Sequence, residues 1–475
     1  MKLNLSKMLV FVAATLLSFL PATVAYGESA LTNMVIYDEQ GREIVPGGYV
    51  TITEDSKGTI HYTPDDYRRM VRMGANFQVI RTTLGKLGGW HGKGEDPAYL
   101  AQLDEMVRMG KEAGLRTIFK MVVYDIRPFG DAEWDAIYHN TGGAQDTLIA
   151  AWSKIWKRYK DEPSVFGYDL LNEPQHGLDP DNERCCREQL LPTLRRLADA
   201  MHAISPNKWA LYQPLFCKDV GGGLNQFQPI REAFGRERVI YAPHLYSMDI
   251  AVMNQMLDRY LREAALSKAP LLIGEWGPST TLDADTDPKK QQRYTQVYQA
   301  TANAIDQHGV GAIKAWFCGT RSWHKSPKRN TLFTWAIFSD TNAVGHVERK
   351  YITDVLARPR PLAVAGHIER FNFDFATRTL DVKLQPDATH SNTEFFVSAD
   401  RFYPEGFRIE VGTGLTLALK PGAQELSQLN SADVINRQQA NQIKWKADSQ
   451  HLVIKQWVLK SPTLTVKILP LKERP

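Results

Sequence analysis

The chain has 475 residues, of which 43% are hydrophobic and 23% are charged, a composition typical of a folded protein with two or more domains. Its formal net charge is only +4, and the sequence has no long basic run, zinc-type cysteine spacing or phosphate-binding glycine loop. The composition therefore gives no reason to expect nucleic acid as a partner.

The amino-terminal segment has the order of a secretory signal peptide. Lys2 and Lys7 precede an apolar run from Met8 to Leu20, and small residues follow as far as Gly27. The apolar run is shorter than the roughly 20 residues that a membrane span needs, with a retained anchor as the alternative. We expect residues 1–27 to be removed and the mature protein to be secreted or periplasmic.

From about residue 49 to residue 358, short strand-like runs alternate with longer runs of helical period. The predicted strands are Gly48–Thr53, Phe77–Thr82, Leu115–Val123, Val165–Leu171, Trp209–Pro214, Val239–His244, Leu271–Glu275 and Ala312–Phe317. The predicted helices are Pro64–Met73, Asp96–Ala113, Ala144–Tyr159, Glu188–Ile204, Ile250–Ala265, Pro288–His308 and Glu348–Leu356. Eight mostly apolar strands favour a parallel sheet buried on both faces, and we predict a (β/α)8 TIM barrel over residues 28–360. An open doubly wound sheet is the alternative, but the glycine turn that normally follows its first strand is missing.

The pattern changes after Pro359. Residues 358–366 (RPRPLAVAG) are interpreted as a stiff connection, and short strands separated by turn residues follow it. These strands are predicted at Ile368–Phe375, Thr379–Leu384, Thr393–Ser398, Phe407–Val411, Leu415–Leu419, Gln442–Ala447, His451–Trp457 and Thr463–Ile468. They indicate a small C-terminal β-sandwich over residues 361–475.

The four cysteines leave two interpretations open. Cys217 pairs with Cys185 or Cys186 in one of them, and in the other all four, Cys318 included, are thiols.

Isolated carboxylates stand at the ends of two predicted barrel strands. Asn172 and Glu173 end the fourth strand, and Glu275 ends the seventh. A buried strand does not ordinarily finish in a lone carboxylate, because removing the charge from water is costly. The carboxyl-terminal strand ends of a barrel carry its catalytic side chains, and two carboxylates facing each other there are what glycoside hydrolysis requires.

The sequence from about residue 33 to residue 359 resembles glycoside hydrolase family 5. Asn172-Glu173-Pro174 is similar to the acid/base motif of that family, and Ile273-Gly274-Glu275-Trp276-Gly277 is similar to its nucleophile strand. The resemblance implies that Glu173 is the acid/base and Glu275 the nucleophile of a retaining β-glycosidase, with no metal or organic cofactor. It also implies supporting or substrate-binding roles for Asn172, Arg81, His244, Tyr246 and Trp316.

One family motif is missing. The family usually has a histidine near the end of strand three, where this chain reads Phe119-Lys120-Met121-Val122-Val123-Tyr124-Asp125. Tyr124 or Asp125 is the candidate to fill that space. Further candidates for sugar or lipid contacts, with surface packing as an equal alternative, are Trp90, His91, Trp134 and Trp323.

The opening Asp38–Arg42, the stretch Thr334–Asp340, residues 358–366 and the sandwich resemble the endoglycoceramidase branch of the family. That resemblance implies a carbohydrate or glycolipid substrate, a β-glycoside with a hydrophobic aglycone. An endo-β-1,4-glucanase acting on polysaccharide is the main alternative, and a catalytically silent carbohydrate-binding protein is a remote one. The basic loop Gly319–Asn330 suggests a transient contact with a membrane surface, against the simpler interpretation of a solvated charge run. We expect a monomer.

Overall fold

A computed structural model describes residues 34–55, 58–88, 95–123, 129–216, 227–228, 230–318, 333–338, 347–390, 392–431, 434–459 and 461–472. The predictions for the signal segment, Cys217, the loop 319–330, Tyr124, Asp125, Trp90, His91 and Trp323 lie outside these residues. In the part of the chain that is described, no helix combines the length and the apolar character that crossing a membrane requires.

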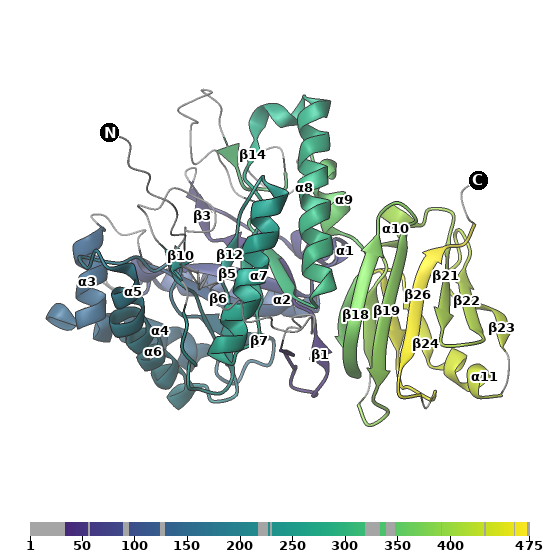
Figure 1. Ribbon diagram of the computed structural model, residues 1–475, viewed down its shortest axis with the longest axis horizontal. Coiled ribbons are helices and arrows are strands. Elements are labelled where there is room, and N and C mark those ends of the chain that lie inside the picture. Colours follow the sequence, from purple (N-terminus) through teal and green to yellow (C-terminus); the bar gives the residue numbers. More distant parts are fainter. Residues whose placement is uncertain are drawn as a thin grey trace, which may run out of the picture. The chain divides into compact units, whose positions relative to one another are not determined.

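The barrel is built from nine strand segments in one hydrogen-bonded sheet (Figure 1). In spatial order they are β11 (Val239–Tyr241), β8 (Trp209–Tyr212), β7 (Val165–Asp169), β6 (Arg116–Val122), β5 (Phe77–Thr83), β2 (Gly47–Ile52), β15 (Gly311–Lys314), β13 (Leu272–Trp276) and β12 (His244–Leu245). Every neighbouring pair is parallel, and β15 pairs with β2.

The two ends of this sheet meet in one interrupted strand. β11 and β12 are separated only by Ala242 and Pro243. The Ala242 N–H donates to the Tyr212 carbonyl, and the Gly274 N–H donates to the Pro243 carbonyl, so both neighbours stay bonded across the break. The ring therefore closes as an eight-stranded barrel, and the predicted fold class is confirmed.

Helices lie between successive strands. They are α1 (Pro64–Arg72), α2 (Pro97–Glu112), α3 (Asp131–His139), α4 (Ala144–Tyr159), α5 (Asn182–Cys185), α6 (Leu191–Ile204), α7 (Ile250–Ser267), α8 (Pro288–Gln307) and α9 (Lys350–Leu356). Several of these helices begin after a residue whose side chain accepts hydrogen bonds from the first free backbone N–H groups. These residues are Thr63, Asp96, Asp249 and Asp287. Shorter strand pairs join the loops: β3 (Glu54–Asp55) with β4 (Gly58–Thr59), β9 (Leu215–Phe216) with β10 (Phe227–Gln228), and β14 (Thr280–Thr281) with β16 (Phe333–Thr334).

The carboxyl-terminal domain is a sandwich of two sheets around its own apolar core. One sheet has the order β18 (Gly366–Asp374), β19 (Thr379–Pro386), β26 (Leu464–Pro470), β21 (Phe407–Val411), β22 (Leu415–Leu419), β23 (Ser427–Ser431). The other has the order β1 (Glu43–Ile44), β17 (Arg360–Val364), β20 (Thr393–Phe396), β25 (His451–Ile454), β24 (Ile443–Lys446). The short helices α10 (Ala399–Phe402) and α11 (Val434–Asn441) lie between strands.

The prediction of a stiff connection over residues 358–366 is wrong in part, because Arg360–Val364 is a fully buried strand of the second sheet. β17 pairs antiparallel with β20 on one side and with β1 on the other. Pro361 interrupts the local strand signal, but an irregular register between Pro361 and Ala363 accommodates it.

Candidate active site

Glu275 lies on β13 with its carboxylate held by two donors. The Lys120 ammonium on β6 lies 2.8 Å from Oε1, and the Tyr246 hydroxyl donates to Oε2 at 2.5 Å. Burial raises the pKa of Glu275, whereas any positive charge on His244, the Lys120 ammonium and the hydrogen bonds from Lys120 and Tyr246 lower it; the net result is a pKa below the ordinary value. Glu275 is therefore an ionised carboxylate, as a nucleophile must be.

Glu173 lies just beyond β7, on a backbone that few side chains adopt. Its φ of 44° is in the left-handed region, which costs a residue other than glycine about 1–3 kcal/mol. The Glu173 N–H donates to Oε1 of Gln213 at 2.9 Å, and the Gln213 amide donates to Asp169 Oδ2 at 2.7 Å. The buried Gln213 thus fixes the turn that presents Glu173.

His244 connects the two glutamates. Its Nδ1 lies 2.8 Å from Oε1 of Glu173 and 3.7 Å from Oε2 of Glu275, while its Nε2 lies 3.1 Å from the Lys120 ammonium. One carboxylate oxygen of Glu173 and one of Glu275 are within 4.8 Å of each other. The side chain of Glu173 is 25% exposed against 10% for Glu275, so the two carboxyl groups have different surroundings.

Lys120, like Gln213, is a site residue that sequence reasoning missed. Arg81, Lys120 and Asp169 are register neighbours on β5, β6 and β7, so their side chains share one face of the sheet. Lys120 is 1% exposed and lies 3.6 Å from Asp169 Oδ2, and burial raises the pKa of Asp169 to about 6 despite the opposing effects of Lys120, His244 and Gln213. A lysine within the apolar run Phe119–Val123 was the available signal.

The other predicted residues are placed as follows. Asn172 is buried directly before Glu173, its N–H donating to the Met121 carbonyl, and Arg81 is half-buried on β5 beside Lys120. A supporting role for Arg81 on the nucleophile stays a prediction, whereas the geometry places Lys120 on that carboxylate. Trp134 is 1% exposed and contacts Phe129 and Tyr138, so it is a core residue of α3 and neither a sugar contact nor a surface-packed loop residue.

Trp316 follows β15 and is tied to a second tryptophan. The backbone N–H of Trp316 donates to the Trp335 backbone carbonyl at 3.0 Å. The same carbonyl also accepts a hydrogen bond from the buried Lys314 side chain at 3.0 Å. The Trp335 ring meets the Tyr246 ring edge-on, with centroids 4.7 Å apart. The segment Phe333–Phe338 therefore contacts the residue that donates to Glu275.

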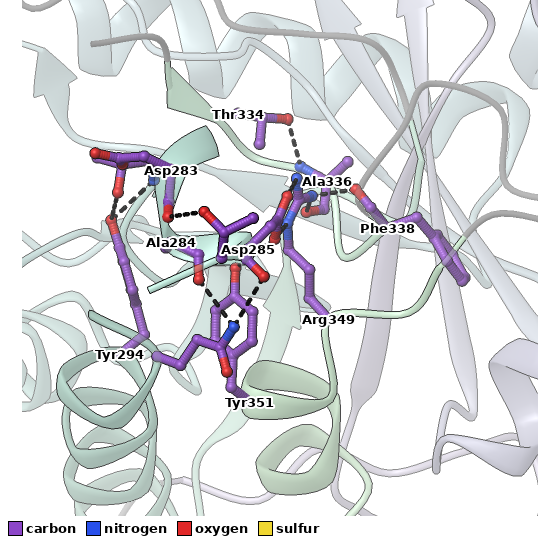
Figure 2. Close-up of polar contacts among 12 residues, drawn as sticks. Asp283, Ala284, Asp285, Tyr294, Thr334, Ala336, Phe338, Arg349 and Tyr351 are labelled. Atoms are coloured by element: carbon purple, nitrogen blue, oxygen red, sulfur yellow. Dashed lines mark hydrogen bonds and ion pairs between the residues drawn. The ribbon is translucent and has the colours of Figure 1, made fainter. Parts of the chain in front are cut away.

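Arg349 contacts the segment Phe333–Phe338 through its guanidinium group, as Figure 2 shows. The guanidinium donates to the carbonyls of Ala336 and Phe338 and forms a two-point ion pair with Asp285 at 2.8 and 2.9 Å. The Tyr351 hydroxyl donates to the same Asp285 at 2.9 Å. Arg349 thus joins the turn after β14 to the segment after strand eight.

Among the described residues, Glu173, His244 and Glu275 are the cluster whose donor atoms lie close enough together to suit a metal ion. The Lys120 ammonium already bonds to two of these side chains and supplies positive charge to the cluster. We therefore assign the cluster to acid–base chemistry.

A parallel barrel with one glutamate at the end of strand four and another on strand seven is the arrangement of a two-carboxylate glycoside hydrolase. Comparison with known families agrees. Residues 47–319 match the family described as cellulase, glycosyl hydrolase family 5, and residues 358–468 match the glycoside hydrolase family 5 C-terminal domain. The chain belongs to glycosyl hydrolase family 5, as the sequence motifs indicated.

Curated relatives include two endoglycoceramidases. Endoglycoceramidase I of Rhodococcus hoagii (strain 103S) is 26% identical over 317 residues, which cover 64% of this chain and 58% of the relative. Endoglycoceramidase of Cyanea nozakii is 25% identical over 309 residues, covering 59% and 54%. The chain thus spans between half and two thirds of the length of these relatives.

Solved structures share the fold over nearly the whole chain. Endo-glycoceramidase II from Rhodococcus sp., as a lactosyl-enzyme intermediate, aligns with a TM-score of 0.67 at 19% identity and covers 92% of this chain and 100% of that one. Sterylglucosidase 1 of Cryptococcus neoformans aligns with a TM-score of 0.66 at 11% identity, covering 93% and 97%.

Proposed function

We propose that this protein hydrolyses β-glycosides with retention of anomeric configuration. The observation that carries the proposal is the pair Glu173 and Glu275, with carboxylate oxygens within 4.8 Å of each other. Retaining enzymes hold their two carboxyl groups about 5–5.5 Å apart, whereas inverting enzymes need roughly 6.5–9.5 Å to admit a water molecule between them. The short separation supports a covalent intermediate on one of the two glutamates.

The surroundings of the two carboxyl groups support the assignment of roles. Glu275, kept ionised by Lys120 and Tyr246, attacks the anomeric carbon and forms an ester with the sugar while the bond to the leaving oxygen breaks. Glu173 gives its proton to that oxygen. It then takes a proton from the water that hydrolyses the ester, and this returns both groups to their first state.

For the substrate we propose a β-glycoside with a hydrophobic aglycone, such as a glycolipid. The endoglycoceramidase relatives and the likeness of both domains to endoglycoceramidase and sterylglucosidase structures support this choice. An endoglucanase of Paenibacillus polymyxa is 24% identical over 39% of this chain, so a β-glucan is the competing substrate. We also propose that the protein is exported as a monomer after cleavage near Gly27, which the mass of the mature protein would test.

The test is mass spectrometry of the products formed from a mixed glycolipid pool, with Glu275→Gln as the blank. We expect intact oligosaccharide and free lipid, both missing from the blank. Untouched glycolipids together with cleavage of β-glucan would replace the glycolipid proposal by the glucanase alternative. Proton NMR of the first sugar released tests retention separately, because an inverting enzyme would release the α-anomer first.

A further inference from the structure

The two ring nitrogens of His244 have partners of opposite kinds. Nδ1 lies 2.8 Å from Oε1 of Glu173, an oxygen that accepts a hydrogen bond both in the ionised carboxylate and in the acid whose proton is on Oε2. Nε2 lies 3.1 Å from the Lys120 nitrogen, and an ammonium can only donate. The ring is 0% exposed, so water does not replace either partner.

Lys120 is an ammonium in this arrangement because two carboxylates face it. Its nitrogen lies 2.8 Å from Glu275 Oε1 and 3.6 Å from Asp169 Oδ2. A neutral lysine would deprive Glu275 of the cation that lies 2.8 Å from its Oε1, while a cationic His244 would set two donors against each other. The carboxyl groups of Glu173, Glu275 and Asp169 around the ring favour an imidazolium, whereas the Lys120 nitrogen at 3.1 Å from Nε2 leaves a proton on Nε2 without an acceptor.

We propose that Lys120 is a positioning residue that fixes His244 as the neutral tautomer with its proton on Nδ1, and thereby determines which oxygen of Glu173 carries the catalytic proton. Nε2 accepts from Lys120, so Nδ1–H donates to Glu173 Oε1. With Oε1 engaged as an acceptor, the transferable proton of Glu173 resides on Oε2. This inference rests on the acid/base role proposed above for Glu173.

The hydrogen bond from His244 Nδ1–H to Glu173 Oε1 acts both before and after Glu173 transfers its proton. When Oε2 has given its proton to the leaving oxygen, Nδ1–H stabilises the carboxylate that forms. Without Lys120 the ring proton is free to move to Nε2, and Nδ1 then becomes an acceptor for the Glu173 proton. Glu173 would donate that proton to His244 instead of to the substrate. With His244 neutral, the ionised state of Glu275 rests on Lys120 and Tyr246.

Leaving-group dependence distinguishes this role from a general loss of structure. kcat/KM is measured for phenyl β-lactoside, whose leaving group needs a proton, and for 2,4-dinitrophenyl β-lactoside, whose leaving group does not. For Lys120→Met we expect the phenyl substrate to lose about 10²-fold more than the dinitrophenyl substrate, since general acid catalysis contributes roughly 10²–10⁴-fold. Tyr246→Phe is the matched control: it removes a donor to Glu275 and leaves the contact between Lys120 and His244 in place, so both substrates should lose alike.

Equal losses on the two substrates in Lys120→Met would overturn the proposal. If that variant does not fold by circular dichroism, ¹⁵N NMR of wild-type protein labelled at histidine decides the question. The signals of His244, identified by their loss in His244→Asn, should show a protonated Nδ1 and an unprotonated Nε2, and the reverse pattern would also overturn it. If wild-type protein hydrolyses no lactoside, glycolipid or β-glucan, the proposed function fails, while the NMR result still decides the tautomer.

Discussion

The ionised state of Glu275 depends on a buried cation that belongs to another strand. Lys120 and Tyr246 hold the two oxygens of the carboxylate separately, so replacing Glu275 by an amide of the same shape removes the proposed nucleophile without opening a cavity. For Glu275→Gln we expect the hydrolysis of 2,4-dinitrophenyl β-lactoside to fall at least about 10³-fold, in line with the loss of other catalytic nucleophiles. Turnover within tenfold of wild type, in a variant with an unchanged circular dichroism spectrum, would rule out the nucleophile role.

Glu173 should behave differently, because its proton matters only for a poor leaving group. For Glu173→Gln we expect kcat/KM for phenyl β-lactoside to fall roughly 10²–10⁴-fold, and that for the dinitrophenyl substrate to fall far less. Steady-state kinetics on the two substrates provide the measurement. A similar loss on both would remove Glu173 from the acid role.

The effect of burial on the pKa of Lys314 can be tested by measuring how the free energy of unfolding changes with pH. Burial lowers the pKa of Lys314 to about 7, although Glu275 raises it, and in the unfolded chain a lysine titrates near its ordinary value of about 10.4. Between these values the unfolded chain binds more protons, so the contribution of Lys314 to the free energy of unfolding rises with pH.

From pH 7.5 to pH 9 this contribution should rise by about 2 kcal/mol, at roughly 1.4 kcal/mol per pH unit. Urea unfolding of wild type and Lys314→Met at both pH values gives the difference directly. A difference that does not change with pH would contradict the assignment.

Sequence reasoning placed in the site the polar residues that follow long apolar runs, and it missed Lys120 and Gln213. Glu173, Glu275, His244 and Tyr246 follow apolar runs, where a polar residue is conspicuous, and all four lie together in the structure. Lys120 and Gln213 act across the barrel on residues far away in the sequence. Their roles depend on the register between strands, which no local pattern contains.

At the level of helices and strands, a segment could be predicted from the sequence when its apolar residues recurred at a regular spacing. α4 begins and ends where the sequence predicted, at Ala144 and Tyr159, since its apolar residues recur at helical spacing. α3 was not predicted: it is only nine residues long and lies within the loop between strands three and four. β17 was missed because two arginine–proline steps, one just before the strand and one at its start, resemble a linker, and only the pairing with β1 and β20 shows the strand.

The segment Phe333–Phe338 depends on Arg349, which is 1% exposed in side chain and bonds to two of its carbonyls. For Arg349→Met we expect a loss of about 3 kcal/mol in the free energy of unfolding, the lower end for breaking a buried ion pair, because Asp285 remains partly exposed and bonded to Tyr351. KM should rise as well, since Trp335 loses its support.

Tyr351→Phe is the control for this prediction, because it removes one hydroxyl from the same Asp285 and should cost only about 1 kcal/mol. Urea unfolding and steady-state kinetics measure both variants. Equal stability losses in the two would show that Arg349 is not the main support of the segment.

In the whole molecule, Arg360 is a deeply buried arginine that joins the sandwich to the barrel, and Arg401 is a more exposed one. From β17 the Arg360 guanidinium donates to the carbonyls of Val45 and Gly74 and to the side-chain oxygen of Asn76. Arg360→Met would remove the donor to the buried Gly74 carbonyl, whereas the Val45 carbonyl still accepts from the Asn76 amide and the Asn76 oxygen from the Gly47 N–H, so we expect the free energy of unfolding to fall by about 1–3 kcal/mol.

The matched control is Arg401→Met, which removes a more exposed arginine that pairs with Glu348 and Asp354 and should cost about 1 kcal/mol or less. Scanning calorimetry with urea titration measures both variants. An equal cost for the two would show that the buried contacts of Arg360 do not hold the domains together.

The pairing of β1 with β17 has a consequence for how the protein is made. Glu43 and Ile44 find their strand partners only at Val364 and Ala363, more than three hundred residues later. On the ribosome, therefore, the segment leading into the first barrel strand waits for its partner until about three quarters of the polypeptide has been synthesised. Contacts this distant in sequence form slowly. A nascent chain that completes its fold so late stays available to chaperones, or to a translocation channel, for most of its synthesis.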